Sequence, residues 1–498
     1  MSSITKILME NTNTIYGRFR QQTETNPDAP AVIEGRRRYT YSELDSMAGR
    51  IAALLPPDAR YIGVVMEHGV LMIASLLAVL KSGAAYVPVE PSFPRERIRF
   101  IMDECKVNLV LANSRYRRML KGLPVLALDS APKGDAPHSE DKSRAADPAY
   151  VLYTSGSTGL PKGVVATNAN VCHYADAFRN EFGIGRGDRM LQYSVCTFDI
   201  FVEEVFATLL SGATLAIPDK KTRDNIGALM QFVADNNVTI ISGFPYLLLE
   251  MNHLDSIPQS LRLLISGGDV LRAGYIDRLL PHVEIYNTYG PSETTVCASY
   301  YRCNGTHALA DGTYPIGKAV KGVKIEIRDS DMKPVANGTP GEICISGNGV
   351  TLGYIGDREI ENRAFVTEEG GRRIYRSGDL GTMLADGTVL FHHRIDSQVM
   401  IMGRRVETCE VENVLCRCPE VESGVVRSGT DSRGLAYLVA YLVPGHKCKF
   451  SLARIKERMR KFLPDYMLPE FFIPLQSIPL TPNGKVDTRA LPPTKKIL

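Results

Sequence analysis

Residues 153–163 carry the strongest local signal for chemistry, a run of hydroxyl side chains and glycines with the sequence YTSGSTGLPKG. Backbone N–H groups and hydroxyls in such a run can close around phosphate oxygens, and the Lys162 ammonium adds positive charge. The Walker pattern cannot be aligned with these residues. We therefore predict a phosphate-binding loop, with a flexible solvated loop as the alternative. The residues expected to contact the phosphates are Thr154, Ser155, Gly156, Ser157, Thr158 and Lys162.

Further motifs flank this loop along nearly the whole chain. They are YTYSEL from Tyr39, LKSGAAYVPVEPSFPRERI from Leu80, FDIFVEEVF from Phe198, NTYGPSETT from Asn287, GEICISG from Gly341, YRSGDLG from Tyr375, HRIDSQVMIMGRRVE from His393 and TPNGKVD from Thr481. In these motifs and their order the chain resembles the adenylate-forming superfamily of acyl- and aryl-CoA synthetases, firefly luciferase and nonribosomal peptide synthetase adenylation domains. It is most similar to a free-standing amino-acid adenylation domain. The resemblance implies an AMP-forming ligase that uses ATP and Mg²⁺.

The YGPSE motif receives nucleotide-binding roles from this resemblance. Tyr289 is expected to stack on adenine, and Asn287 to contact the exocyclic amine of the base. Glu293 is expected to hold Mg²⁺, which bridges phosphate oxygens and neutralises charge as pyrophosphate departs. Without the resemblance, Tyr289 would be interpreted as a core aromatic and Glu293 as a solvated surface charge. The same motif supplies the further nucleotide contacts Gly290, Ser292 and Thr294.

The later motifs supply a carboxylate, two cations and a hinge. The resemblance implies that Asp379 accepts both ribose hydroxyls and that Arg394 approaches the same sugar, whereas the alternative for Asp379 is a turn residue. Lys485 is expected to reach the reacting carboxylate and the α-phosphate, as a flexible point charge can. Asp396 is expected to be the hinge about which a small domain rotates between two half-reactions.

The implied mechanism needs no protein nucleophile. The substrate carboxylate attacks the α-phosphorus in line, and positioning and charge stabilisation by Lys485, Mg²⁺ and Thr158 supply the catalysis. A thiol then attacks the resulting mixed anhydride. The chain departs from the family near the hinge, where His393 replaces the usual glycine and Met400 the usual lysine. Neither change removes a catalytic group.

The FDIFVEEVF motif bears on which acid is activated. Asp199 is expected to pair with the α-ammonium of an amino acid, because a buried carboxylate costs roughly several kcal/mol unless it is paired; the alternative is a helix N-cap. Glu203 in a mostly apolar pocket calls for a second cation, which predicts a basic substrate such as lysine or ornithine. A small rotation of the helix would instead leave Glu203 solvated, with Glu204 beside it. The predicted pocket is Asp199, Ile200, Glu203, Tyr246, Ile265, Gly267, Thr288, Val296, Cys297 and Lys485.

The expected partner is a separate carrier protein. The chain ends soon after the lysine motif, so a phosphopantetheinylated carrier in trans is expected to receive the acyl group. A D-alanine:carrier ligase is a rival, although its small substrate would not need Glu203. An acyl- or aryl-CoA synthetase would not need Asp199. A non-catalytic nucleotide-binding relative would be expected to have lost Lys485, Glu293 or the phosphate loop, and all three are present.

Sequence texture indicates which elements position these residues. Helical patterns alternate with short β-rich runs through the first half, which predicts α/β layers with parallel strands. After about Asp311, short alternating runs broken by Asn-Gly, Pro-Gly and Asp-Gly predict an antiparallel, hairpin-rich unit. The last 100 or so residues mix helical and strand patterns, including the helix SLARIKERMRKF. The predicted class is α/β, with a large N-terminal domain (1–395) of layered α/β subdomains plus a β-rich subdomain, and a small mobile α+β C-terminal domain (396–498).

Composition excludes several classes of protein. A chain of 498 residues with 44% hydrophobic and 23% charged residues is that of a globular protein of two or more domains. A net charge of +3 predicts no nucleic-acid partner, and nothing demands more than a monomer. The first residues lack a signal-peptide pattern, and the longest apolar stretch, 70–80, is too short to cross a bilayer and predicts a buried helix. With ten scattered cysteines expected to be free thiols, we expect a cytoplasmic protein without membrane contact.

Overall fold

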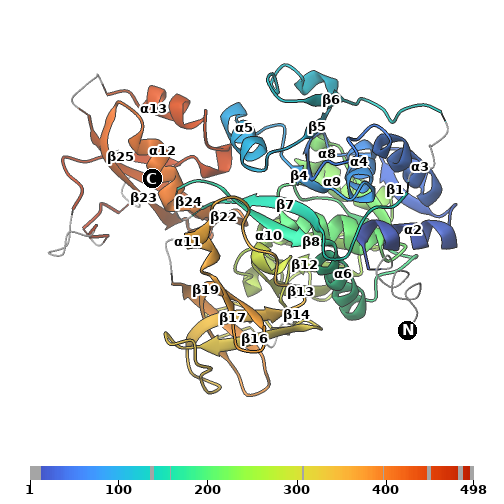
Figure 1. The fold of residues 1–498 in the computed structure, drawn as a ribbon. Coiled ribbons are helices and arrows are strands. Elements are labelled where there is room, and N and C mark those ends of the chain that lie inside the picture. The colour runs from blue at the N-terminus through green and yellow to red at the C-terminus, as the bar shows by residue number, and fades with distance from the viewer. Residues whose placement is uncertain are drawn as a thin grey trace. The chain divides into compact units, whose positions relative to one another are not determined.

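The structure is a computed structural model that describes residues 13–134, 140–156, 159–304, 308–395, 398–445, 450–479, 486–488 and 490–493. The chain divides into two units (Figure 1). The large unit contains Met1–Pro91, Met102–Leu152 and Gly163–His393, and the small unit contains Ser92–Ile101, Tyr153–Lys162 and Arg394–Leu498. Among the helices of the described residues, none is both long and apolar enough to cross a membrane.

The first sheet of the large unit has six strands in the order β6-β5-β3-β4-β7-β8. Strand β3 pairs parallel with β4 and β5, β5 with β6, and β4 with β7, as the helix–strand alternation predicts. Helix α4 (Val70–Lys81) connects β3 to β4 and is buried on nearly every side, which confirms the predicted buried helix. The strands are β3 (Tyr61–Val65), β4 (Ala85–Pro88), β5 (Leu109–Ala112), β6 (Val125–Ala127), β7 (Pro148–Thr154) and β8 (Lys162–Thr167).

The second sheet has nine strands in the order β15-β14-β13-β12-β11-β9-β10-β1-β2. Its centre is parallel, whereas β2, β14 and β15 at the two edges pair antiparallel. One hydrophobic cluster covers the face toward α4 and α6 (Asn168–Phe182), and another covers the opposite face with α9 (Ile226–Asp235) and α10 (Pro245–Asn252). The strands are β1 (Pro30–Glu34), β2 (Arg37–Thr40), β9 (Arg189–Leu191), β10 (Thr214–Ile217), β11 (Ile240–Gly243), β12 (Leu263–Ser266), β13 (Glu284–Tyr289), β14 (Ser299–Cys303) and β15 (Lys318–Ala319).

Local sequence signals account for the ends of the helices. The longest, α6 (Asn168–Phe182), begins with a capping box between Thr167 and Asn170 and ends at Gly183 in the left-handed conformation. Helix α3 begins with a similar box between Thr40 and Glu43. The remaining helices of the large unit are α2 (Ile15–Thr25), α3 (Tyr41–Ala52), α7 (Asp199–Val202), α8 (Lys220–Arg223), α9 (Ile226–Asp235), α10 (Pro245–Asn252) and α11 (Glu359–Asn362); α5 (Arg95–Glu104) belongs partly to each unit.

The β-rich part of the large unit is antiparallel, as predicted from its turn signals. Its five strands are ordered β16-β17-β19-β18, with β20 beside β19. Strand β17 pairs antiparallel with β16 and β19, and β18 pairs antiparallel with β19. The strands are β16 (Val323–Arg328), β17 (Gly341–Gly347), β18 (Phe365–Thr367), β19 (Arg373–Met383) and β20 (Val389–Arg394).

The small unit has the mixed α and β elements that its sequence predicts. Helices α12 and α13 share one hydrophobic cluster with a three-stranded sheet, β23-β24-β25. The ion pair between Arg97 and Glu410 lies in this unit, with Nη1 and Oε1 2.6 Å apart. Its elements are β21 (Gln398–Ile401), β22 (Arg404–Glu407), α12 (Thr408–Cys416), β23 (Val421–Thr430), β24 (Ala436–Pro444), α13 (Leu452–Met459) and β25 (Phe471–Pro474).

Candidate functional site

Asp199 opens helix α7 and is partly buried. The N-cap of this helix is Phe198, so the alternative interpretation of Asp199 as an N-cap is wrong. The Ser292 hydroxyl donates to Asp199 Oδ2 at 2.5 Å. Burial raises the pKa of Asp199 to about 7, and the neighbouring charge of Glu293 adds to the rise. The carboxylate is therefore poised to ionise fully only when a cation comes close.

A π-helical turn, η2 (Glu203–Ala207), follows α7 directly. Such wide turns occur as short insertions in α-helices and are frequent at functional sites. Both Glu203 and Glu204 are buried in it, so the alternative in which Glu203 is solvated is wrong. Glu204 accepts hydrogen bonds from Ser194 N and Gln192 Nε2, each at 3.0 Å, and is held by the protein itself.

Glu203 has a different environment from its neighbour. The Tyr174 hydroxyl donates to its Oε2, and the Ser242 hydroxyl lies near enough to lower the pKa of the carboxyl. Oε1 has no partner at hydrogen-bonding geometry among the described residues. Burial raises the pKa of Glu203 to about 7, and the charge of Asp199 raises it further. The two carboxylates stand four residues apart, which is about one helical turn.

Three side chains around Glu203 come from other elements. Burial raises the pKa of the Tyr300 hydroxyl, and nearby Cys297 and Glu203 add to the effect. Burial, with Cys297 and Glu203 nearby, likewise raises the pKa of Tyr174 on α6. Tyr300 is the cross-strand partner of Thr288 in the β13–β14 pair, and its hydroxyl has no hydrogen-bond partner in the described part of the chain. Glu203 thus lies among two phenols and a thiol.

The nine-stranded sheet separates two groups of predicted residues. Ile265 pairs with Tyr286, and Ser266 pairs with Asn287, in the parallel β12–β13 ladder. Because side chains alternate between the faces of a sheet, Ile265 and Thr288 share one face and Asn287 lies on the other. A Cβ at Gly267 would stand 2.7 Å from Thr288 Oγ1, so glycine leaves space beside that threonine.

Asn287 presents one free amide oxygen. Its Nδ2 donates to the carbonyl of Pro315 at 2.9 Å, which fixes the orientation of the amide. Its Oδ1 is buried and has no hydrogen-bond partner among the residues described. A buried acceptor of this kind costs free energy until a donor reaches it. The predicted contact with the exocyclic amine of adenine would supply that donor.

Tyr289 and Asp379 are joined directly. The Tyr289 hydroxyl donates to Asp379 Oδ2 at 2.6 Å. Asp379 is 4% exposed and lies within strand β19, so the alternative interpretation as a turn residue is wrong. Tyr289 ends strand β13, is only partly buried and packs against a hydrophobic cluster of the large unit.

Glu293 lies in a short 3₁₀ turn, η4 (Ser292–Thr294), and is fully buried. The Tyr354 hydroxyl donates to its Oε1 at 2.5 Å. A carboxylate oxygen is a ligand type that Mg²⁺ prefers, and phosphate oxygens can complete the coordination, so Glu293 fits the predicted metal. Thr295, directly after this turn, has φ +85°, which is strained for a β-branched residue and typical of functional sites.

The predicted phosphate loop belongs to the small unit. Ser155 is buried, and its hydroxyl donates to the carbonyl of Arg405 at 3.1 Å. Lys162 is 4% exposed, so the alternative of a solvated loop is wrong for these two residues. A Cβ at Gly156 would stand 1.8 Å from the carbonyl of Leu160, so only glycine fits there. The hydroxyl of Thr154 is buried without a partner among the described residues.

Four predicted residues fall outside the described part of the chain: Ser157, Thr158, Asp396 and Lys485. Their roles stay predictions. Arg394, the last residue of β20, is partly exposed. Among the other predicted residues, Tyr246 donates its hydroxyl to Asp269 Oδ2 at 2.5 Å, and Ile200, Val296 and Thr294 are buried. Gly290 is required sterically, since a Cβ there would stand 2.2 Å from the carbonyl of Val296.

A second polar cluster beside the site can be accounted for without a metal. One ligand atom each from His68, Glu90 and Cys196 lies within 4.8 Å of the others. Glu90 Oε1 already accepts from Cys196 N and lies 2.8 Å from His68 Nε2. His68 Nδ1 lies 2.9 Å from Gln192 Oε1, and Gln192 bonds Glu204. Burial keeps the pKa of the Cys196 thiol well above its usual range, which disfavours metal binding. The cluster therefore supports the turn that carries Glu204.

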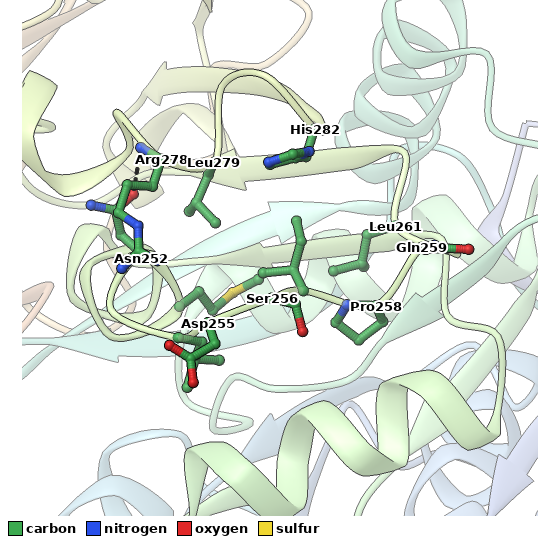
Figure 2. A pocket seen from close by; sticks show the side chains of 12 residues that line it. Asn252, Asp255, Ser256, Pro258, Gln259, Leu261, Arg278, Leu279 and His282 are labelled. Atoms are coloured by element: carbon green, nitrogen blue, oxygen red, sulfur yellow. Dashed lines mark hydrogen bonds between the residues drawn. The ribbon is translucent and has the colours of Figure 1, made fainter.

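Figure 2 shows a pocket elsewhere on the large unit, with a volume of about 410 Å³. Its floor and walls come from the end of α10 and from two segments near Pro258 and Leu279. None of the predicted site residues lines it. The lining residues are Met251, Asn252, Leu254, Asp255, Ser256, Ile257, Pro258, Gln259, Leu261, Arg278, Leu279 and His282.

Sequence reasoning missed four side chains that the structure brings to the site: Tyr174, Ser242, Tyr300 and Tyr354. None of them belongs to a motif quoted above. Tyr300 follows the YGPSE motif by a few residues, and strand alternation from Thr288 could have found it once β13 and β14 were paired. The others are brought in by tertiary packing, for which the sequence gives no local signal.

Family models match most of the chain. A model described as AMP-binding enzyme matches residues 19–355, and one described as AMP-binding enzyme C-terminal domain matches residues 410–485. Bacitracin synthase 2 of Bacillus licheniformis is 36% identical over 482 residues, which are 95% of this chain and 18% of that protein. Tyrocidine synthase 1 of Brevibacillus parabrevis is 34% identical and covers 96% of this chain and 45% of its own length. The chain thus spans less than half the length of these curated relatives.

Solved structures share the fold. The adenylation domain AlmE of Vibrio cholerae, in complex with glycyl-adenosine-5'-phosphate, has a TM-score of 0.84 at 21% identity, over 95% of this chain and 96% of its own. Holo-PA1221, an NRPS protein containing adenylation and PCP domains, has a TM-score of 0.84 at 25% identity, over 96% of this chain and 83% of its own. These likenesses confirm the predicted fold class, with a large N-terminal and a small C-terminal domain.

Proposed function

The chain belongs to the family of AMP-binding enzymes, and from this membership we propose that it joins an amino acid to AMP and then passes the aminoacyl group to a thiol on a carrier protein. The finer part of the proposal is that the amino acid is basic. In this proposal Asp199 binds the α-ammonium and Glu203 the side-chain cation. The predicted place in the adenylate-forming superfamily is confirmed by the two family matches.

The observation that carries the proposal is the pair of carboxylates at Asp199 and Glu203. Neither forms an ion pair with a cation among the described residues, and burial raises the pKa of each to about 7. An ammonium group beside each carboxylate would restore the charged form and offset the cost of burial. A substrate with two ammonium groups fits two such sites better than a fatty or aryl acid does.

Residues of the large unit support binding of ATP. Asn287 Oδ1 would accept from adenine, Tyr289 would stack on the base, and Asp379 would accept from the ribose hydroxyls. Glu293 would hold Mg²⁺, which would offset negative charge on the phosphates as pyrophosphate leaves. We assign Thr158 and the other phosphate-loop residues to the phosphates, and Lys485 to the reacting carboxylate, on the family resemblance.

Two displacements make up the proposed reaction. First, a carboxylate oxygen of the amino acid attacks the α-phosphorus of ATP, the bond from that phosphorus to the bridging oxygen breaks, and pyrophosphate leaves. Second, the sulfur of a thiol attacks the carbonyl carbon, the bond to the AMP oxygen breaks, and AMP leaves as the thiol gives up its proton. Asp199 would position the substrate through its α-ammonium in both steps.

Two findings support a carrier protein as the thiol donor. The curated relatives are synthases named for peptides such as bacitracin and tyrocidine, and this chain spans only part of each. PA1221 contains adenylation and PCP domains. We propose a phosphopantetheine thiol on a carrier protein presented in trans as the acceptor, in preference to coenzyme A.

Pyrophosphate exchange across ornithine, lysine, leucine, D-alanine, a fatty acid and an aryl acid tests the proposed function. We expect ornithine or lysine to give the highest kcat/KM. Exchange with fatty or aryl acids only would overturn the proposal that the substrate is an amino acid. A preference for D-alanine or leucine would overturn the proposal that its side chain is basic. For the second step, mass spectrometry should show an aminoacyl thioester on a holo carrier protein. Acylation of coenzyme A instead would overturn the proposal that a carrier protein is the acceptor.

The variants Glu203→Gln and Glu204→Gln form a matched pair within one buried turn. Glu203→Gln should lower kcat/KM for ornithine and lysine about 100-fold, because the side-chain ammonium loses its counter-charge, and should spare leucine. Glu204→Gln should change kcat/KM for all amino acids alike, since the Glu204 carboxylate is held by Gln192 and Ser194. Equal losses for basic and neutral substrates in Glu203→Gln would contradict the assignment of Glu203.

A further inference from the structure

Glu203 has one oxygen in use and one available. Tyr174 donates to Oε2, and the Ser242 hydroxyl lies near the same carboxylate. Oε1 has no partner at hydrogen-bonding geometry among the described residues, in a side chain that is 1% exposed. The hydroxyl of Tyr300 is likewise without a hydrogen-bond partner in the part of the chain that the structure describes, and its side chain is 8% exposed. A buried, unpartnered acceptor beside a second unpartnered hydroxyl indicates a site for a ligand that donates hydrogen bonds.

We propose that Tyr174 and Tyr300 make this site selective for a primary ammonium over a guanidinium, so that the enzyme activates diamino acids and rejects arginine. The inference deepens the proposed function and rests on it. It adds two specificity-determining residues, one on α6 and one on β14, that no motif of the sequence includes.

The shapes of the two cations give the reason. A guanidinium is planar and binds carboxylates through two parallel N–H···O bonds, which need both oxygens of the carboxylate. At Glu203 the phenol of Tyr174 already donates to Oε2, so a two-oxygen contact would require breaking that bond inside a buried pocket. A primary ammonium is a compact point charge that needs only one carboxylate oxygen.

Tyr300 would supply the second acceptor. An ammonium has three N–H donors and each should find a partner when buried. Oε1 of Glu203 accepts one, and the Tyr300 oxygen can accept another while its own proton turns away. Cys297 borders the same space, since its thiol and Glu203 both influence the titration of Tyr300. A thiol is a weak acceptor, so it does not replace the phenol.

Two substitutions test the proposal in pyrophosphate exchange with the full chain, using ornithine, lysine, arginine and leucine. Wild type should favour ornithine or lysine over arginine by about tenfold or more in kcat/KM. Tyr174→Phe should lower that ratio about tenfold, because both oxygens of Glu203 become available to a guanidinium. Tyr300→Phe should raise KM for ornithine and lysine about tenfold and leave leucine unchanged, since a hydrogen bond to a charged group is lost.

Tyr16→Phe is the matched control. Tyr16 is also a buried phenol that donates to a carboxylate, Asp45, at 2.6 Å, and it lies on α2 outside the site. Its loss should leave the ornithine-to-arginine ratio unchanged. An unchanged ratio in Tyr174→Phe would overturn the proposal.

The outcomes also separate this inference from the proposed function. The wild-type preference needs no variant, so a folding defect in Tyr174→Phe cannot hide the answer. Activation of arginine as well as or better than ornithine and lysine would overturn the selectivity for ammonium while leaving a basic-amino-acid enzyme standing. Activation of neutral amino acids only would overturn the proposed basic substrate and this inference with it.

Discussion

Tyr289 and Asp379 are 90 residues apart in sequence, yet the phenol of one donates to the carboxylate of the other at 2.6 Å. The bond links the end of β13 in the nine-stranded sheet to β19 in the β-rich part of the large unit. It holds the edge of the Tyr289 ring in one orientation beside the Asp379 carboxylate. An aromatic face and a carboxylate fixed side by side are suited to a nucleoside, whose base stacks and whose ribose donates.

Asp379→Ala should raise KM for ATP about tenfold to 100-fold, because the buried carboxylate that we propose accepts from the two ribose hydroxyls is removed. Tyr289→Phe keeps the ring and loses only the hydroxyl, so its KM for ATP should rise about threefold or less. Pyrophosphate exchange at varied ATP measures both, with KM for the amino acid as the internal control. An unchanged KM for ATP in Asp379→Ala would contradict the ribose assignment.

As the pH falls, kcat/KM for the amino acid should fall more steeply with basic substrates than with neutral ones. Burial raises the pKa of Asp199 and of Glu203 to about 7, and as neighbours they titrate as a pair. Below pH 7 each gains a proton in the free enzyme and loses its attraction for an ammonium. The logarithm of kcat/KM should therefore fall with a slope near two for ornithine and near one for leucine.

Glu203→Gln is the control for this pH dependence, since it removes one of the two titrating groups. With ornithine its slope below pH 7 should drop to about one, whereas its profile with leucine should match that of wild type. The measurement is kcat/KM between pH 5.5 and 8.5 at saturating ATP. Parallel profiles for ornithine and leucine in wild type would show that Glu203 does not bind the substrate's second cation.

Much of the architecture could be predicted because it is encoded locally. The alternation of helical and strand patterns predicts the parallel sheets, and the Asn-Gly and Asp-Gly turns predict the antiparallel part. Asp199 and Glu203 could be found because both lie in one motif. The π-helical turn could not be predicted, because FVEEVF has the pattern of an ordinary helix. A sequence pattern also does not reveal that Glu203 and Glu204 are both buried.

The neighbours of Glu203 could not be predicted from the sequence for a different physical reason. Tyr174 precedes it by 29 residues on another helix, and the two meet only because α6 packs against η2. Tyr300 arrives through the antiparallel register that sets it opposite Thr288. Contacts of this kind depend on how elements pack, and no spacing within a single segment records them.

Glu204 should make the protein less stable as pH rises. Burial raises its pKa to about 8 in the folded state, above the 4.5 expected when unfolded. The native state therefore holds this proton more firmly, so its stabilising effect is complete below about pH 4.5 and is lost as pH rises through 8. Between pH 5.5 and 8.5 the melting temperature should fall by about a few degrees. Glu204→Gln should make that fall smaller because the amide cannot ionise, while Asp199 and Glu203, whose pKa values burial also raises, still contribute to it.

The exposed carboxylate Glu359 offers a control for this effect. Its side chain is 86% exposed, so Glu359→Gln should leave the pH dependence of the melting temperature as in wild type. Differential scanning fluorimetry without ligands provides the measurement. A melting temperature that rises with pH over this range in wild type, and identically in Glu204→Gln, would contradict the role given to Glu204.

Gly267→Ala should shorten the pocket. A Cβ there would stand 2.7 Å from Thr288 Oγ1, closer than real Cβ contacts, so the Thr288 side chain, a member of the predicted pocket, must shift. Because one methyl group in a pocket is worth about tenfold to 100-fold in discrimination, kcat/KM for lysine should fall about tenfold more than that for alanine. Gly274→Ala, at a position with no atom within 4 Å of the added Cβ, should change neither. Equal effects of Gly267→Ala on lysine and alanine would mean that the substrate side chain does not extend past Gly267.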